Sequence, residues 1–351
     1  MRHIAACQWR RAIVLSTITA LLAAFVGPGS AVAADSAVVI MYHRFGEDRY
    51  PSTNVTIEQF EAHIAELSRD EYSVRSLPEI VAAIQAGRPL PENTVGISID
   101  DAYLSVYREA WPRLRAARFP FTVFVATEQV DNGSRGHMSW DQLREMANAG
   151  VTIGNHTVTH AHMPMLSTSR NASEISNANA RFKAELGIVP NLIAYPYGEY
   201  SLAVGKVTQQ AGFSVGFGQH SGVINRTSDF LNLPRFAFNE SYADIDRLRT
   251  AARALPLETS DVTPADMLLR KSNNPPLFGF TVNNIPPQSL PRLACYVSGQ
   301  GKAQIERLGE KRIEVRMAQA FRAGRTRINC TFPEKEGRWR WFGRQFVVPP
   351  G

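Results

Sequence analysis

Short apolar runs typical of buried strands alternate with segments of helical periodicity from residue 36 to about residue 253. Two of the helical segments carry a start signal, because Thr56 stands three residues before Gln59 and Ser76 three residues before Glu79. The strands expected from this pattern are SAVVIMYH, YSVRS, TVGISI, FPFTVFVA, VTIGN, NLIAY, FSVGFG and LPRFAF. Further helices are expected over residues 105–118, 139–149, 173–186, 203–211 and 242–252.

This repeat of strand and helix predicts an α/β fold. Roughly seven or eight such units suit either a (β/α) barrel or a doubly wound open sheet. Both architectures place chemistry at the carboxyl ends of the strands. Polar residues that directly follow a strand are therefore the candidates for a functional site.

The pattern changes after Leu255. Prolines become frequent in SNNPPLFGF and NNIPPQSLPRL, and short β-type runs follow in LACYVS, RIEVRM, TRINCTF and RWRWFGRQFVV. We therefore expect an α/β domain over residues 35–255, a linker over 256–274 and a small basic all-β domain over 275–351.

The first residues are typical of a targeting segment. Three arginines precede the apolar run AIVLSTITALLAAFV, and the small-residue stretch AVAA ends at Ala34. A membrane-spanning helix is the alternative, but the run is short for a bilayer and Gly-Pro-Gly interrupts it. We predict a signal peptide over residues 1–34, a periplasmic or secreted mature protein, and no membrane span after cleavage.

The chain has three cysteines, and Cys7 lies in the predicted leader. The exported protein would keep Cys295 and Cys330, an even pair in an oxidising compartment. This predicts one disulfide in the small β domain.

Charge is distributed unevenly along the chain. The net charge is +6, but from Lys271 onward 14 Lys and Arg face only 5 Asp and Glu, a net charge of +9. With the three leader arginines set aside, residues 35–270 carry about −6. We expect the basic domain either to bind an anionic polymer of the cell envelope or to present a solvated surface. Nucleic acid is not an expected partner.

Two clusters of polar residues follow expected strands. Asp100 and Asp101 end the strand in SIDDAY, and His156 and His160 follow the strand VTIGN. A spacing of four puts both imidazoles on one face of a helical turn, within reach of one metal ion. One carboxylate would join them as a ligand, and the other would serve as general base. The alternative for the two acids is a helix N-cap, which accounts for only one of them.

A third strand end lies in NLIAYPYGEYS. Its Pro-aromatic-Gly turn can leave the backbone N–H of Tyr197 free to donate to an oxyanion, although the same sequence also forms ordinary turns.

The order of MYHRF, SIDDAY, HTVTH and YPYG resembles the polysaccharide deacetylase family, the NodB homology domain, over roughly residues 38–253. The resemblance implies a distorted (β/α) barrel, a divalent metal that is usually zinc, and hydrolysis of N-acetyl groups on amino sugars. It implies that Asp100 is the general base, that Asp101, His156 and His160 are the metal ligands, and that Tyr197 is the backbone oxyanion donor. MYHRF and YPYG are closer to the deacetylases of exported poly-N-acetylglucosamine than to the nodulation enzymes.

The chain departs from the family pattern at three places. Ala102 stands where the first motif usually has Gly, and Ala194 stands where the third motif usually has the Arg that orients the base. The Leu-x-His triplet of the family's general acid does not occur, and His220 is the only histidine after His162, so His220 is the candidate acid. His43 and His162 are expected outside the metal shell.

The sequence therefore predicts a metal-dependent hydrolase that removes N-acetyl groups from the amino sugars of an exported or cell-envelope polysaccharide. Two alternatives stay open. One is a non-catalytic carbohydrate-binding protein built on a deacetylase-like barrel, and the other is a hydrolase of another amide or of an O-acetyl ester.

Overall fold

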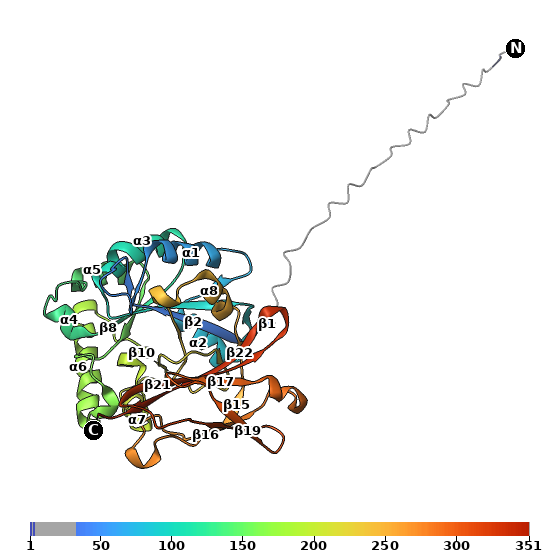
Figure 1. Cartoon of the computed structure of the whole chain (residues 1–351). Helices are drawn as coiled ribbons and strands as arrows, with labels where there is room; N and C mark the ends of the chain where they lie inside the picture. The colour runs from blue at the N-terminus through green and yellow to red at the C-terminus, as the bar shows by residue number, and fades with distance from the viewer. Residues whose placement is uncertain (2, 4–32, 351) are drawn as a thin grey trace. The chain divides into compact units, whose positions relative to one another are not determined.

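The computed structural model describes residues 1, 3 and 33–350 (Figure 1). Most of the predicted signal peptide, residues 2 and 4–32, lies outside the described residues; its last two residues form β1 (Ala33–Ala34) and pair with β6 (Leu90–Pro91). Within the described part of the chain, no helix combines the length and apolar character needed to cross a bilayer.

A curled nine-stranded sheet forms the centre of the α/β part, with strand order β11-β10-β9-β8-β7-β2-β12; β13 pairs with β2, and β5 pairs with β7. Its strands are β2 (Ser36–Tyr42), β5 (Ser73–Val74), β7 (Thr94–Asp100), β8 (Thr122–Val125), β9 (Thr152–Asn155), β10 (Ile193–Ala194), β11 (Gly216–Phe217), β12 (Ile224–Asn225) and β13 (Phe236–Ala237). All pairings are parallel except β12 with β2. The predicted distorted barrel is confirmed.

Helices follow the strands and lie along the outer side of the sheet (Figure 1). They are α1 (Ile57–Leu67), α2 (Leu77–Gln85), α3 (Trp111–Ala116), α4 (Thr127–Asp131), α5 (Trp140–Asn148), α6 (Thr168–Leu186), α7 (Leu202–Gln210) and α8 (Ile245–Ala252). The start signal of α1 is a full capping box: the Thr56 hydroxyl accepts the N–H of Gln59, whose side chain accepts the N–H of Thr56.

Two expected helices differ in detail. Helix α6 begins five residues earlier than residue 173, because Ser167 caps it by accepting the N–H of Arg170. The segment expected over 105–118 opens as a π-helical turn, Val106–Ala110, before α3 continues it.

Two further sheets follow the barrel and are called the C-terminal sheets below. Their strand orders are β14-β22-β21-β17-β18 and β15-β16-β20-β19. Their strands are β14 (Leu255–Pro256), β15 (Thr259–Thr263), β16 (Phe278–Val282), β17 (Ala294–Val297), β18 (Gly301–Lys302), β19 (Gln304–Leu308), β20 (Arg312–Arg316), β21 (Gly324–Pro333) and β22 (Trp339–Val348). The predicted additional all-β part is confirmed.

The residues expected to form a linker, 256–274, are partly sheet. β14 pairs with β22, and β15 pairs with β16. The polar sequence of β15, TSDVT, lacks the apolar alternation that reveals a strand, so its pairing partner decides its structure. One buried apolar cluster also contains both barrel side chains such as Tyr195 and C-terminal ones such as Phe278. The basic C-terminal sheets are therefore packed on the barrel, and the division into two domains stays a prediction.

Cys295 in β17 and Cys330 in β21 are directly opposite each other in antiparallel register and form a disulfide, as predicted. Both side chains are fully buried. The bond ties together two neighbouring strands of the sheet that reaches the barrel.

The double variant Cys295→Ala/Cys330→Ala is expected to lose roughly 4 kcal/mol of unfolding free energy, because the disulfide closes a loop with a sequence separation of 35. Urea unfolding of oxidised wild type, reduced wild type and the variant measures this. The reduced wild type should match the variant, and a variant as stable as oxidised wild type would contradict the prediction.

Candidate metal and catalytic centre

The two adjacent acids diverge because the backbone turns sharply where β7 ends. Asp100 is the last residue of this buried strand, and Asp101 and Ala102 follow in left-handed conformations with φ of 74° and 52°. Such a conformation costs a residue with a β-carbon roughly 1–2 kcal/mol, which accounts for the glycine that resembling sequences place at Ala102. Neither acid is a helix cap, because Ser105 precedes the next helical turn.

Asp101 meets the two predicted histidines. Its Oδ1 lies 3.4 Å from Nε2 of His156 and 3.2 Å from Nε2 of His160, and one ligand atom from each residue lies within 4.8 Å of the other two. His156 donates from Nδ1 to the carbonyl of Ala194 at 2.7 Å, which orients the ring so that its Nε2 faces Asp101. That Nε2 is buried without a hydrogen-bond partner.

These residues fit a divalent metal. Burial, followed by the neighbouring His156, lowers the pKa of His160 to about 4, so this imidazole is neutral near pH 7, as a metal ligand must be. One carboxylate oxygen and two imidazole nitrogens form the donor set that zinc prefers, and three protein ligands leave a position open.

The histidine segment is a loop and not the expected helical turn. Thr157 and His160 have φ of 68° and 55°, and α6 begins only at Thr168. A buried carboxylate holds this loop: Glu174 accepts the N–H groups of Val158 and Thr159 at 3.1 and 2.9 Å. The two histidines therefore converge through a shaped loop that α6 supports.

Asp100 is held by an arginine that sequence analysis did not identify. Arg235 donates from Nη1 to Oδ1 at 2.7 Å and from Nη2 to Oδ2 at 2.9 Å, and both side chains are fully buried. Its Nε donates to the carbonyl of Gly218 at 2.9 Å. Burial is the largest influence and would raise the pKa of Asp100, but the charge and hydrogen bonds of Arg235, together with His156 and His43, hold the pKa below its usual value.

Arg235 is the arginine partner of Asp100 that the third motif lacks at Ala194. It comes from the segment leading into β13, which pairs with β2 beside β7, and not from the strand that ends at Ala194. The signal in the sequence was an arginine inside the apolar run LPRFAF, where a charge needs a buried partner.

Tyr197 has the turn conformation expected of it, with φ of 60°. Its carbonyl accepts the side-chain amide of Gln345 at 2.9 Å, whereas no backbone carbonyl of the described residues accepts its N–H. Its ring stacks on His162 at 4.1 Å and meets the edge of His160 at 4.4 Å. His162 donates from Nδ1 to Glu199 and is outside the metal cluster, as expected.

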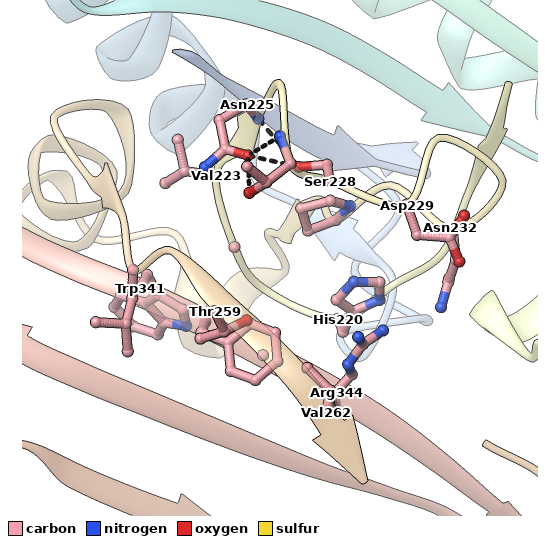
Figure 2. A pocket seen from close by; sticks show the side chains of 16 residues that line it. His220, Val223, Asn225, Ser228, Asp229, Asn232, Thr259, Val262, Trp341 and Arg344 are labelled. Atoms are coloured by element: carbon pink, nitrogen blue, oxygen red, sulfur yellow. Dashed lines mark hydrogen bonds between the residues drawn. The ribbon is translucent and has the colours of Figure 1, made fainter. Parts of the chain in front are cut away.

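The structure separates the two remaining histidines. His43 lines a cleft of about 660 Å³ together with Asp101, His160 and Tyr197. His220 is 5% exposed and faces a different pocket of about 180 Å³, beside Arg344 and next to the C-terminal sheets (Figure 2). Its placement therefore does not support the expected role of His220 as general acid.

Comparison with known proteins agrees with this geometry. The polysaccharide deacetylase family profile matches residues 87–216, which contain both acids, the two histidines predicted as metal ligands, and Tyr197. YxkH of Bacillus subtilis (strain 168) is 26% identical over 197 residues, 56% of this chain and 69% of YxkH. The poly-beta-1,6-N-acetyl-D-glucosamine N-deacetylase of Staphylococcus aureus (strain MRSA252) is 24% identical over 235 residues, 59% of this chain and 80% of the relative.

Solved structures show the same fold. IcaB from Ammonifex degensii is 27% identical, with a TM-score of 0.55 over 63% of this chain and 98% of IcaB. The deacetylase PplD of Streptococcus pyogenes has a TM-score of 0.58 at 20% identity, over 62% of this chain and 98% of PplD. Residues 87–216 therefore match a polysaccharide deacetylase domain, and the motifs SIDDAY, HTVTH and YPYG, with the converging residues of the Asp-His-His cluster, lie within that match.

Proposed function

We propose that the protein is a metal-dependent hydrolase that removes N-acetyl groups from the amino sugars of an exported or cell-envelope polysaccharide. The observation that carries the proposal is an Asp-His-His cluster beside a second, ion-paired carboxylate, opening on one cleft. Poly-N-acetylglucosamine is the first polymer to test, because a relative named as its deacetylase covers 59% of the chain.

Asp101, His156 and His160 would hold the metal, with zinc the first choice for this donor set. A divalent metal held there would polarise the acetamide carbonyl and lower the pKa of water. Asp100 would accept the proton of the attacking water, because Arg235 holds both carboxylate oxygens and keeps the group ionised.

Two further groups would act on the substrate. The N–H of Tyr197 would donate to the oxygen that becomes negative when water adds to the carbonyl. His43 would donate a proton to the amine as the C–N bond breaks, since it lines the same cleft and His220 does not. The products are acetate and a free amino sugar.

The alternative of a non-catalytic carbohydrate-binding protein loses its main support. That alternative depended on a missing arginine and a missing acid, whereas Arg235 occupies the first role from another strand and His43 is available for the second. Hydrolysis of a different amide or of an O-acetyl ester uses the same groups, so acetate release from a panel of N-acetylated and O-acetylated glycans decides between them.

Asp101→Ala, His156→Ala and His160→Ala should each lose bound metal, because three protein ligands leave no redundancy. Elemental analysis after dialysis measures the metal-to-protein ratio. His162→Ala is the matched control in the same loop and should keep its metal. Full occupancy in two of the three ligand variants would remove the proposed metal site.

Asp100→Asn should retain metal and fold, yet lose acetate release by roughly 10²–10⁴-fold, the usual contribution of a positioned general base. Arg235→Gln should also lower kcat with metal retained. It should in addition lose roughly 3–5 kcal/mol of stability, since it leaves a buried carboxylate without its partner. Near wild-type turnover in Asp100→Asn would end its assignment as the base.

His43→Gln and His220→Gln form a matched pair that identifies the acid. Loss of His43 should lower kcat by roughly 10²–10⁴-fold with metal bound, whereas His220→Gln should leave the kcat of folded protein close to wild type. Steady-state kinetics per bound metal makes the comparison independent of yield. The opposite ranking would restore His220 as the acid.

A further inference from the structure

One wall of the active-site cleft comes from the C-terminal sheets. Arg325 and Arg327 of β21 line the same cleft as Asp101 and His160, together with Ser298, which follows β17. Because side chains two residues apart on a strand point to the same face, both guanidinium groups project from one face of β21. The basic part of the chain thus contributes directly to the pocket where the chemistry takes place.

Arg325 lies close to the metal ligands. Its guanidinium stands 5.1 Å from the centre of the Tyr197 ring, and that ring is 4.4 Å from His160. Its Nη1 donates to the carbonyl of Tyr197 at 3.3 Å. Its ion-pair partner is Glu199 at 3.9 Å, whose other oxygen already accepts His162 at 2.8 Å. The charge of Arg325 is therefore only partly neutralised.

Arg327 is held by neutral groups. Its Nε donates to Gln345 at 2.9 Å and its Nη2 to Gln219 at 3.4 Å, and no ion pair involves it among residues 33–350. Burial, followed by the charge of Arg325, lowers the pKa of Arg327 to about 10, so it stays protonated at neutral pH. Two cations side by side, one without a counter-ion, are unfavourable in the free protein unless an anion joins them.

Apart from the 3.9 Å pair between Glu199 and Arg325, the acids near the cleft do not supply that anion. Asp101 belongs to the metal cluster, and both oxygens of Asp100 are bound by Arg235. A guanidinium fork matches a planar carboxylate in shape and charge, and two forks on one strand face define a preferred position for it.

We propose that Arg325 and Arg327 form an anion subsite for the carboxylate of a sugar next to the N-acetylated sugar, so that the enzyme acts on an acidic amino-sugar polysaccharide. The inference rests on the proposed deacetylase function and narrows its substrate class. It also changes the expected role of the basic C-terminal residues: these two select substrate inside the cleft and do not tether the enzyme from outside.

The test compares matched oligosaccharides. Oligomers that alternate glucuronic acid with N-acetylglucosamine are assayed for acetate release beside the same oligomers with their carboxyl groups reduced to alcohols. Neutral β-1,6-linked N-acetylglucosamine oligomers are the third substrate. For wild type, kcat/KM should be at least about tenfold higher for the acidic oligomer than for its reduced form. The difference should come from a lower KM for the acidic oligomer, and the ratio of the two kcat/KM values should fall as salt rises.

In the double variant Arg325→Gln/Arg327→Gln, the ratio of kcat/KM for the acidic oligomer to that for the reduced oligomer should fall to about one, because the two guanidinium groups that bind the carboxylate are gone. Lys302→Gln removes one exposed positive charge from β18 of the same sheet and should keep the wild-type ratio. Metal content and melting temperature show whether each variant is folded. The comparison of the acidic and reduced oligomers on wild-type enzyme tests the proposal even if a variant does not fold.

The outcomes separate the two claims. A wild-type ratio near one, a ratio that persists in the double variant, or turnover of the neutral β-1,6 oligomers alone would overturn the anion subsite and leave the deacetylase function standing. Acetate release from none of the three oligomers would remove the proposed function and this inference with it.

Discussion

Two charged groups that are both fully removed from water, Asp100 and Arg235, organise the functional end of the barrel. Isolated burial of either charge would be prohibitive, so each group requires the other in a fixed geometry. The guanidinium also lies 5.4 Å from the ring of Phe124 and 5.9 Å from that of Phe217. Gly154 makes room for this arrangement, because a β-carbon there would collide with the ring of Phe124.

The cluster of Asp101, His156 and His160 depends on the same end of the sheet. β7 delivers Asp101, β9 leads into the loop of His156 and His160, and β10 provides the Ala194 carbonyl that orients His156. Because these strands and β8, which lies between β7 and β9, run parallel side by side, their carboxyl ends bring three separate sequence motifs together. Asp101, His160 and Tyr197 adopt left-handed backbone conformations that residues with a β-carbon disfavour. All three belong to the site, where the surrounding structure holds such conformations in place.

Sequence patterns predicted helices and strands well where neighbouring residues determine the local structure. Capped helices and apolar strands were expected from neighbouring residues alone, and the disulfide from an even pair of cysteines in a chain predicted to be exported. The convergence of Asp101, His156 and His160 was also expected, because strand ends meet at one edge. Patterns failed where a distant partner decides the outcome: the polar strand β15 is set by its neighbour β16, and Arg235 reaches Asp100 from 135 residues away in sequence. The side chains of Arg325 and Arg327 reach the cleft only because the C-terminal sheets share a core with the barrel.

The central claim is that one metal ion at the Asp101 cluster and the adjacent Asp100 carboxylate together hydrolyse an acetamido sugar. The most direct measurement is stepwise zinc addition to metal-free protein, with acetate release from N-acetylglucosamine oligomers followed at each step. The account predicts no release without metal, a rise in proportion to bound zinc, and saturation at one ion per chain. Acetate release by metal-free protein, or none from fully loaded protein on any acetylated glycan, would contradict it.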